Sequence, residues 1–225
     1  SSTSRGLGDV YKRQGYDFAT AKSIYADGKN AQKDSGDYRT LGGFASATGK
    51  NHDYDSYYGA DGSIGAHIMA AMDGTGDFEG TSDTVRYQGI AKLTVNMGMV
   101  GYTIHELNAA IAKAEAGNWG TDDAQHAWDE GWAFFHGPEA NYGCSPAKVM
   151  EKRAADFGTA DADGNAATFI ATRNAMNDGL TALQNEDMQG VTDARDEVLK
   201  NLVIVYSQAV LKYTSKMDSN CLLYT

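Results

Sequence analysis

Hydrophobic residues recur every three or four positions along most of the chain after residue 84, which is the period of an amphipathic helix. Other helices are expected over residues 17–26, 64–72, 121–136, 146–157, 166–184 and 191–216. The longest run covers about residues 84–116 and carries one apolar stripe, formed by Ile90, Leu93, Met97, Val100, Ile104, Leu107 and Ile111. Because no segment alternates convincingly as a strand does, the pattern predicts an all-α fold, a helical bundle of four or five main helices with a loop-rich N-terminal lobe.

Short local signals mark where several of these helices begin and end. Thr121 is expected to cap the helix that follows it, and Gly137 is expected to end that helix. Ser145 followed by Pro146 is the clearest start signal in the chain, and Gly158 marks the end of the same helix. These signals place the helices independently of their apolar period.

The two ends and the first third of the chain are expected to add little regular structure. Residues 1–14 and 221–225 resemble the translation of a sequencing-library adaptor, so we treat them as tails and expect one domain over residues 15–220. Residues 33–80 are rich in Gly, Asp, Ser and Tyr, so this region is expected to be mostly loop around the single helix at 64–72.

Composition narrows the classes of partner. The chain has 225 residues, 42% of them hydrophobic, and a net charge of −11. An acidic surface repels phosphate backbones and anionic lipids, which argues against nucleic-acid partners and is compatible with binding cations. No apolar run approaches the length of about 20 residues that crosses a bilayer, so the segment is not expected to span a membrane. Cys144 is the single cysteine within residues 15–220, so no disulfide within that segment is expected.

The densest group of chemically capable side chains lies in the helix expected at 121–136. His126, Asp129 and Glu130 share one face of it, since positions i, i+3 and i+4 are neighbours, and the opposite face carries Trp128, Trp132 and Phe135. One imidazole and two carboxylates suit iron, manganese or zinc. The alternative is that the aromatic face is core and the acidic face is solvated, and the metal hypothesis requires the polar face to point inward.

A second pair, His105 and Glu106, lies in the long preceding helix. Adjacent residues point about 100° apart on a helix, so both cannot face one ion without distortion. His105 is expected at the edge of the apolar stripe and Glu106 largely away from it. The pair does not belong to a His-Glu-x-x-His zinc motif, because Ala109 stands where the second histidine would be.

Three further groups are weaker candidates. The first combines tyrosines with His52 and acidic residues and offers hard ligands for ferric ion, although a polar surface loop explains it as well; its members are Tyr54, Tyr57, Tyr58, His52, Asp53 and Asp55. Residues 161–164 begin like a calcium loop but lack the remaining ligands, so a turn is expected. The acidic group at 193–197 is interleaved with basic residues and is expected to form a solvated surface with ion pairs.

Three segments carry a resemblance to a known family. Residues 126–137, His-Ala-Trp-Asp-Glu-Gly-Trp-Ala-Phe-Phe-His-Gly, resemble the Asp-Glu-Ala-Trp-Ala-Phe-Tyr-x-Gly signature of the algal iron-assimilation proteins, also called low-iron-inducible periplasmic proteins. Residues 17–30 are similar to the opening segment of that family, and residues 151–159 resemble its Lys-Arg-Ala-x-x-Phe-Gly-Thr stretch. The order and spacing of the three segments extend the resemblance over about residues 15–216.

The resemblance implies a secreted or periplasmic protein without enzymatic activity that concentrates iron at the cell surface when iron is scarce. It supports reversible binding of Fe(II) or Fe(III) by Asp129, Glu130 and His126, with His105 or Glu106 added from the neighbouring helix. A membrane iron transporter or reductase would then be the partner that receives the ion. Two alternatives stay open: an imelysin-like metal-dependent hydrolase, and a structural or interaction module of the cell surface that binds no metal.

Overall fold

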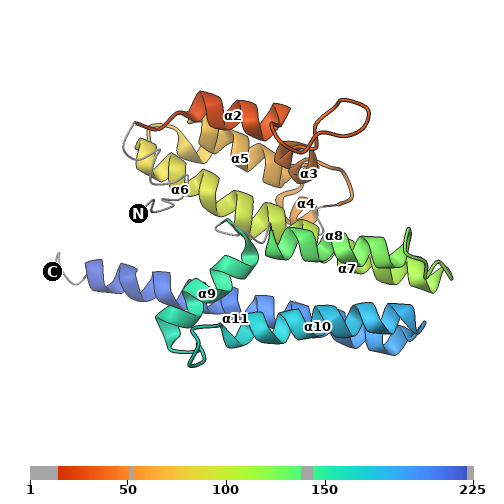
Figure 1. The fold of residues 1–225 in the computed structure, drawn as a ribbon. Helices are drawn as coiled ribbons and strands as arrows, with labels where there is room; N and C mark the ends of the chain where they lie inside the picture. The colour runs from red at the N-terminus through yellow and green to blue at the C-terminus, as the bar shows by residue number, and fades with distance from the viewer. Residues whose placement is uncertain (1–14, 51–52, 138–143, 222–225) are drawn as a thin grey trace, which may run out of the picture. The chain divides into compact units, whose positions relative to one another are not determined.

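The computed structural model describes residues 15–50, 53–137 and 144–221. In these ranges the regular structure is helical, apart from two isolated β-bridges, so the all-α prediction is confirmed (Figure 1). The described residues form two compact units, and the division between them falls within one helix, after His105. The residues up to His105 are called the first unit and those from Glu106 the second unit. A single domain over residues 15–220 and a bundle of four or five main helices stay predictions.

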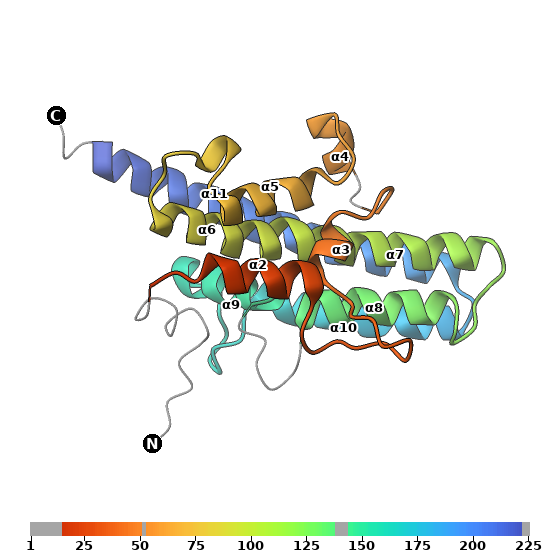
Figure 2. The ribbon, with the colours of Figure 1, turned by 90° about the horizontal axis from the view of Figure 1, so that it is seen from above.

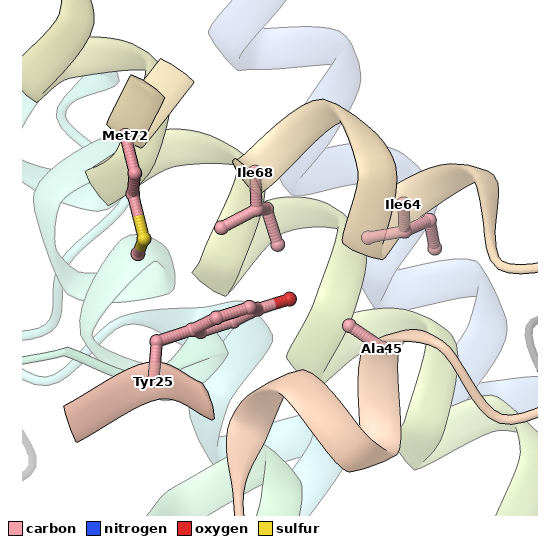
Figure 3. Close-up of a cluster of buried hydrophobic side chains, with 5 residues drawn as sticks. All are labelled: Tyr25, Ala45, Ile64, Ile68 and Met72. Atoms are coloured by element: carbon pink, nitrogen blue, oxygen red, sulfur yellow. The ribbon is translucent and has the colours of Figure 1, made fainter. Parts of the chain in front are cut away.

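The first unit is a cluster of short helices built around α5. Its elements are α2 (Phe18–Asp27), α3 (Leu41–Ala45), α4 (Asp53–Tyr58), α5 (Ser63–Asp73), the 3₁₀ turn η1 (Gly76–Phe78), α6 (Asp83–Leu93), the π-helical segment η2 (Thr94–Met99) and the start of α7 (Val100–Glu115). Helices α2, α3, α4 and α6 all pack against α5. Figure 2 shows α5 following α4 and running beside α6. A core of buried side chains is formed by Tyr25 of α2, Ala45 of α3 and three residues of α5, Ile64, Ile68 and Met72 (Figure 3). The position of α5 at the centre therefore sets the positions of the others.

The helices expected at 17–26 and 64–72 are present, whereas the loop expected over 33–80 is only partly correct. This region also contains α3, α4 and η1. Thr40 caps α3 by accepting a hydrogen bond from the Gly43 amide at 2.9 Å. A helix of five or six residues is too short to show a helical period and depends on tertiary packing for its stability. The hydrophobic pattern therefore could not reveal α3 or α4.

The helix expected over 84–116 is continuous but changes character along its length. It runs as α6, then the π-helical segment η2, then α7. After η2 the most deeply buried positions include the small residues Thr103, Ala110 and Ala114, whereas Ile104 and Ile111 are only half-buried. Small side chains allow a neighbouring element to approach closely, so shape rather than hydrophobicity selects the buried face.

The second unit contains the rest of α7 with α8 (Ala124–His136), α9 (Pro146–Phe157), α10 (Ala167–Gln184) and α11 (Met188–Cys221). Helices α10 and α11 form a hairpin through the turn at 185–187 and lie side by side in Figure 1. Helices α8 and α9 pack on α10. The buried residues of this unit include Trp128, Phe135, Met150, Leu183, Val191, Val198, Leu202 and Val205. Packing of α8 against α10 thus fixes the helix that carries the candidate metal ligands.

The start of α9 agrees with its sequence signal, and the start of α8 does not. Ser145 accepts a hydrogen bond from the Lys148 amide at 3.3 Å, and α9 ends at Gly158 in the left-handed conformation. The expectation that Thr121 caps α8 is wrong, because residues 121–123 form a turn and α8 begins at Ala124. The carbonyl of Gly120 accepts hydrogen bonds from two amides that follow it, so the backbone performs part of the role that was expected of a side-chain cap.

Candidate metal centre

Of the three residues on the aromatic face of α8, Trp128 and Phe135 are buried and Trp132 is half-buried, which agrees with the alternative in which this face is core. Trp128 is only 2% exposed, and its Nε1 donates a hydrogen bond to the carbonyl of Met176 at 2.9 Å. The indole lies directly over Gly179 of α10, where an added Cβ would stand 2.0 Å from Trp128 Cζ2. Phe135, which is fully buried, stacks with Phe169 at 6.3 Å between ring centroids. These contacts fix both the position and the rotation of α8.

The last turn of α8 adds a histidine to the aromatic cluster. The His136 imidazole stacks on Trp132, with ring centroids 4.7 Å apart and planes inclined by 17°. Its Nδ1 lies 2.9 Å from the carbonyl oxygen of Gly137. Because a carbonyl only accepts, Nδ1 carries the hydrogen in this contact. His136 is therefore part of the packing at the end of α8 rather than of its polar face.

The polar face of α8 points to solvent. The side chains of His126 and Glu130 are 58% and 45% exposed, and Asp129 is exposed as well. The inward orientation that the metal hypothesis requires is therefore not met, because the large aromatic side chains of α8 gain more free energy from burial than the charged ones could. Any ion on this face would be bound at the surface.

Two of the three predicted ligands on α8 lie at a spacing that suits one ion. His126 Nε2 is 3.4 Å from Glu130 Oε1, one helical turn away. Two donors that each lie about 2.1 Å from a metal are about 3.4 Å apart at a tetrahedral angle. Among the described residues no three histidine, cysteine or acidic side chains form a group able to hold a metal. Asp129 as a third ligand stays a prediction.

The second predicted pair differs from its expected placement. Glu106 is only 6% exposed, so the expectation that it lies largely away from the apolar stripe is wrong. Glu106 is buried because it lies on the same face of α7 as the buried residues Thr103, Leu107 and Ala110. His105 is half-buried beside Tyr102, with ring centroids 5.5 Å apart. His105 is the last residue of the first unit and Glu106 is the first residue of the second. Their role as ligands for an ion on α8 stays a prediction.

The tyrosine-rich group of α4 is tied to α5 through Asp55. Asp55 Oδ1 accepts hydrogen bonds from the amide of Ser63 at 3.0 Å and from its hydroxyl at 2.8 Å. Burial raises the pKa of Asp55, but these bonds outweigh it and the net shift is downward. His52 lies outside the described residues, as does the side chain of Asp53. Asp55 thus serves to anchor the start of α5.

His67 is not among the candidate residues that the sequence pattern predicts. In the structure its ring lies 4.8 Å from the ring of Tyr58, and its Nε2 lies 3.8 Å from Asp77 Oδ2. Nothing in the local sequence indicated this grouping, because the three residues belong to α4, α5 and η1 and are brought together by two turns. Only the tertiary arrangement reveals it.

The two remaining groups are as expected. Asp161 Oδ1 accepts hydrogen bonds from the amides of Asp163 and Asn165 at 3.0 and 2.8 Å, which is the geometry of a turn. On α11, Glu197 pairs with Lys200 at 2.8 Å, and Arg195 pairs with Asp196 at 2.6 Å. Both predictions are confirmed, and neither group offers a site.

Comparison with known proteins identifies the family. Within the described part of the chain no helix is both long enough and apolar enough to cross a membrane. No curated protein and no solved structure matches the sequence significantly. The family model described as "Low iron-inducible periplasmic protein" matches residues 14–223, which is nearly the whole chain and includes the Trp128 helix. The chain therefore belongs to the family of low iron-inducible periplasmic proteins.

Proposed function

We propose that this protein is a secreted or periplasmic iron-binding protein that assists iron uptake when iron is limiting. The observation that carries the proposal is membership of a family described as low iron-inducible and periplasmic over residues 14–223. The net charge of −11 supports it, because a negative surface raises the local concentration of cations. Iron is the cargo of such a protein, and no catalytic step is assigned to it.

The exposed face of α8 is the proposed place where iron binds. The imidazole of His126 and the carboxylate of Glu130 lie 3.4 Å apart, and Asp129 lies between them in sequence. Imidazole and carboxylate both bind iron. A single helix supplies at most three ligands here, so water fills the other positions and binding is reversible. Such a site suits a protein that passes iron to a membrane transporter or reductase.

The packing of the buried side of α8 supports a role of this helix in iron binding. Trp128 is held by its hydrogen bond to Met176 and by close packing on Gly179. A helix fixed in this way presents His126 and Glu130 without local unfolding, which lowers the entropy cost of binding. In this proposal His105 and Glu106 remain candidates for a further ligand from α7.

Metal titration of the full chain tests the proposal. Equilibrium dialysis against ferrous iron under anaerobic conditions, and against ferric iron as a weak chelate, measures the amount bound, with zinc and calcium for comparison. Substitution of Asp129 and Glu130 together by alanine is expected to weaken iron binding at this site at least tenfold. Addition of His126→Ala to this double variant is expected to weaken binding further. Substitution of Asp193 and Asp196 by alanine, a pair of exposed acids on α11, is the matched control and is expected to change little.

Two results would count against the proposal in different ways. Unchanged iron binding in the Asp129/Glu130 variant would show that the ion binds elsewhere. Absence of iron binding by the unaltered protein at micromolar concentration would contradict the function itself. It would favour the alternative in which the aromatic motif of α8 only stabilises the fold.

A further inference from the structure

One ring nitrogen of His67 is held by the backbone of α5, and the other points away from that contact. Its Nδ1 lies 3.0 Å from the carbonyl oxygen of Ser63. A carbonyl oxygen only accepts hydrogen bonds, so Nδ1 carries the hydrogen and Nε2 of the neutral ring carries a lone pair. Histidines that bind metals usually have their second nitrogen fixed in this way, often by a backbone carbonyl.

The second ring nitrogen of His67, Nε2, faces a carboxylate. Nε2 lies 3.8 Å from Asp77 Oδ2, which is longer than a hydrogen bond. In the neutral form of the histidine both atoms are acceptors, so they repel each other unless a cation lies between them. The Asp77 side chain is 85% exposed and free to rotate, so both atoms can reach a distance of about 2.1 Å from one metal ion.

The turn that carries Asp77 is fixed by the packing of its neighbour. Phe78 lies so close to α6 that a Cβ added to Gly89 would stand 2.4 Å from Phe78 Cε1. The Thr81 hydroxyl donates a hydrogen bond to the Phe78 carbonyl at 2.8 Å. The turn passes through Gly74 and Gly76, which both have positive φ angles. The backbone at Asp77 is therefore held near His67 by interactions that do not involve the Asp77 carboxylate.

A phenol ring lies next to the imidazole. The Tyr58 ring is 4.8 Å from the His67 ring, and α4 is anchored to the start of α5 by the Asp55–Ser63 hydrogen bonds. A bound cation favours loss of the phenol proton, which passes to solvent.

We propose that His67, Asp77 and Tyr58 form a second site in the first unit for a transition-metal cation, with one nitrogen and two oxygen ligands. Ferric iron fits this donor set best, because carboxylate and phenolate are hard ligands and imidazole is compatible with iron. The site goes beyond the proposed function, since it uses no residue of α8 and lies entirely within the first unit. Water would fill the remaining coordination positions.

The test uses the full chain and a signal that the α8 face cannot give. Ferric iron bound to a phenolate has a charge-transfer absorption band in the visible range, and α8 contains no tyrosine. The protein is titrated with ferric nitrilotriacetate, once unaltered and once with His126, Asp129 and Glu130 replaced by alanine. Both proteins are expected to develop the band. Tyr58→Phe is expected to abolish it, while Tyr57→Phe, which alters a tyrosine that is 82% exposed, is expected to retain it.

Two more variants test the nitrogen and carboxylate ligands. His67→Ala and Asp77→Asn are each expected to weaken ferric binding at this site at least tenfold, and Glu79→Gln serves as the control for charge near Asp77. Far-UV circular dichroism checks the fold of each variant. If His67→Ala does not fold, Asp77→Asn still decides the matter, because its exposed side chain contributes little to packing.

The outcomes separate this inference from the proposed function. Absence of the band, or a band that survives Tyr58→Phe, would overturn the second site whatever happens on α8. Equal ferric affinity in Asp77→Asn and the unaltered protein would do the same. Loss of binding only when α8 is altered would support the proposed function and refute the second site.

Discussion

The contact between Trp128 and Gly179 gives the sharpest test of how α8 is held. Replacement of Gly179 by alanine places a methyl group 2.0 Å from Trp128 Cζ2 and 2.6 Å from its Cη2. The indole cannot yield easily, because it is 2% exposed and donates a hydrogen bond to Met176. The ring must therefore move as a whole, or α8 and α10 must separate.

The expected cost follows from three terms. Overpacking of a core costs about 1–3 kcal/mol, and loss of the indole hydrogen bond costs about 1 kcal/mol more. Alanine gains about 1 kcal/mol over glycine in the interior of a helix. The Gly179→Ala variant should therefore be about 2 kcal/mol less stable, which lowers the urea midpoint by about 1 M at a slope of about 2 kcal/mol per M.

Urea unfolding measured by tryptophan fluorescence suits this test, because all three tryptophans lie in the second unit. Gly120→Ala is the matched control: an added Cβ there meets nothing closer than 3.7 Å, so its stability should stay equal or rise slightly. In a Trp128→Phe background, unfolding is followed by circular dichroism. There Gly179→Ala should lower the free energy of unfolding by less than about 0.5 kcal/mol, which is the usual effect of a surface substitution. The reasoning is refuted if Gly179→Ala unfolds at the same urea concentration as the unaltered protein, or if Trp128→Phe leaves its cost unchanged.

Three further predictions concern other parts of the chain. Burial raises the pKa of Tyr25 to about 12, and among the described residues its hydroxyl has no hydrogen-bond partner, so Tyr25→Phe should keep or raise stability by up to about 1 kcal/mol at pH 7. In urea unfolding, the unaltered protein should become less stable as the pH rises from 10 to 12, and the Tyr25→Phe variant should not show this decrease. A hydrogen bond from Lys212 lowers the pKa of Asp156. The pair therefore stabilises the folded protein above the ordinary aspartate pKa of about 3.9, and this contribution is lost as the pH falls below that value. Asp156→Asn should flatten that acid limb in thermal unfolding at pH 2–7, and an unchanged limb would contradict the role of the pair. Arg86 donates to the carbonyls of Ala71 and Met72 and lies 3.8 Å over the Phe18 ring, so Arg86→Ala should cost about 2 kcal/mol in urea unfolding measured by circular dichroism.

Local sequence determined the helices and several of their ends. The Ser145 cap before α9 and the Gly158 cap after it depend on atoms within four or five residues, so a short motif was enough to place both ends of the helix. The approach of His126 to Glu130 is local in the same sense, because one helical turn separates them. A polar and an aromatic face on α8 could therefore be predicted without knowledge of the fold.

Tertiary structure decided which faces are buried and which distant residues meet. The polar face of α8 points to solvent because Trp128 fits over Gly179, which lies 51 positions further along the chain. Glu106 is buried although its position in the apolar period indicated otherwise. His67 meets Asp77 only because the turn after α5 brings them together. Hydrogen bonds within a helix are fixed by nearby backbone, whereas the burial of a side chain depends on the shape of partners that no local pattern specifies.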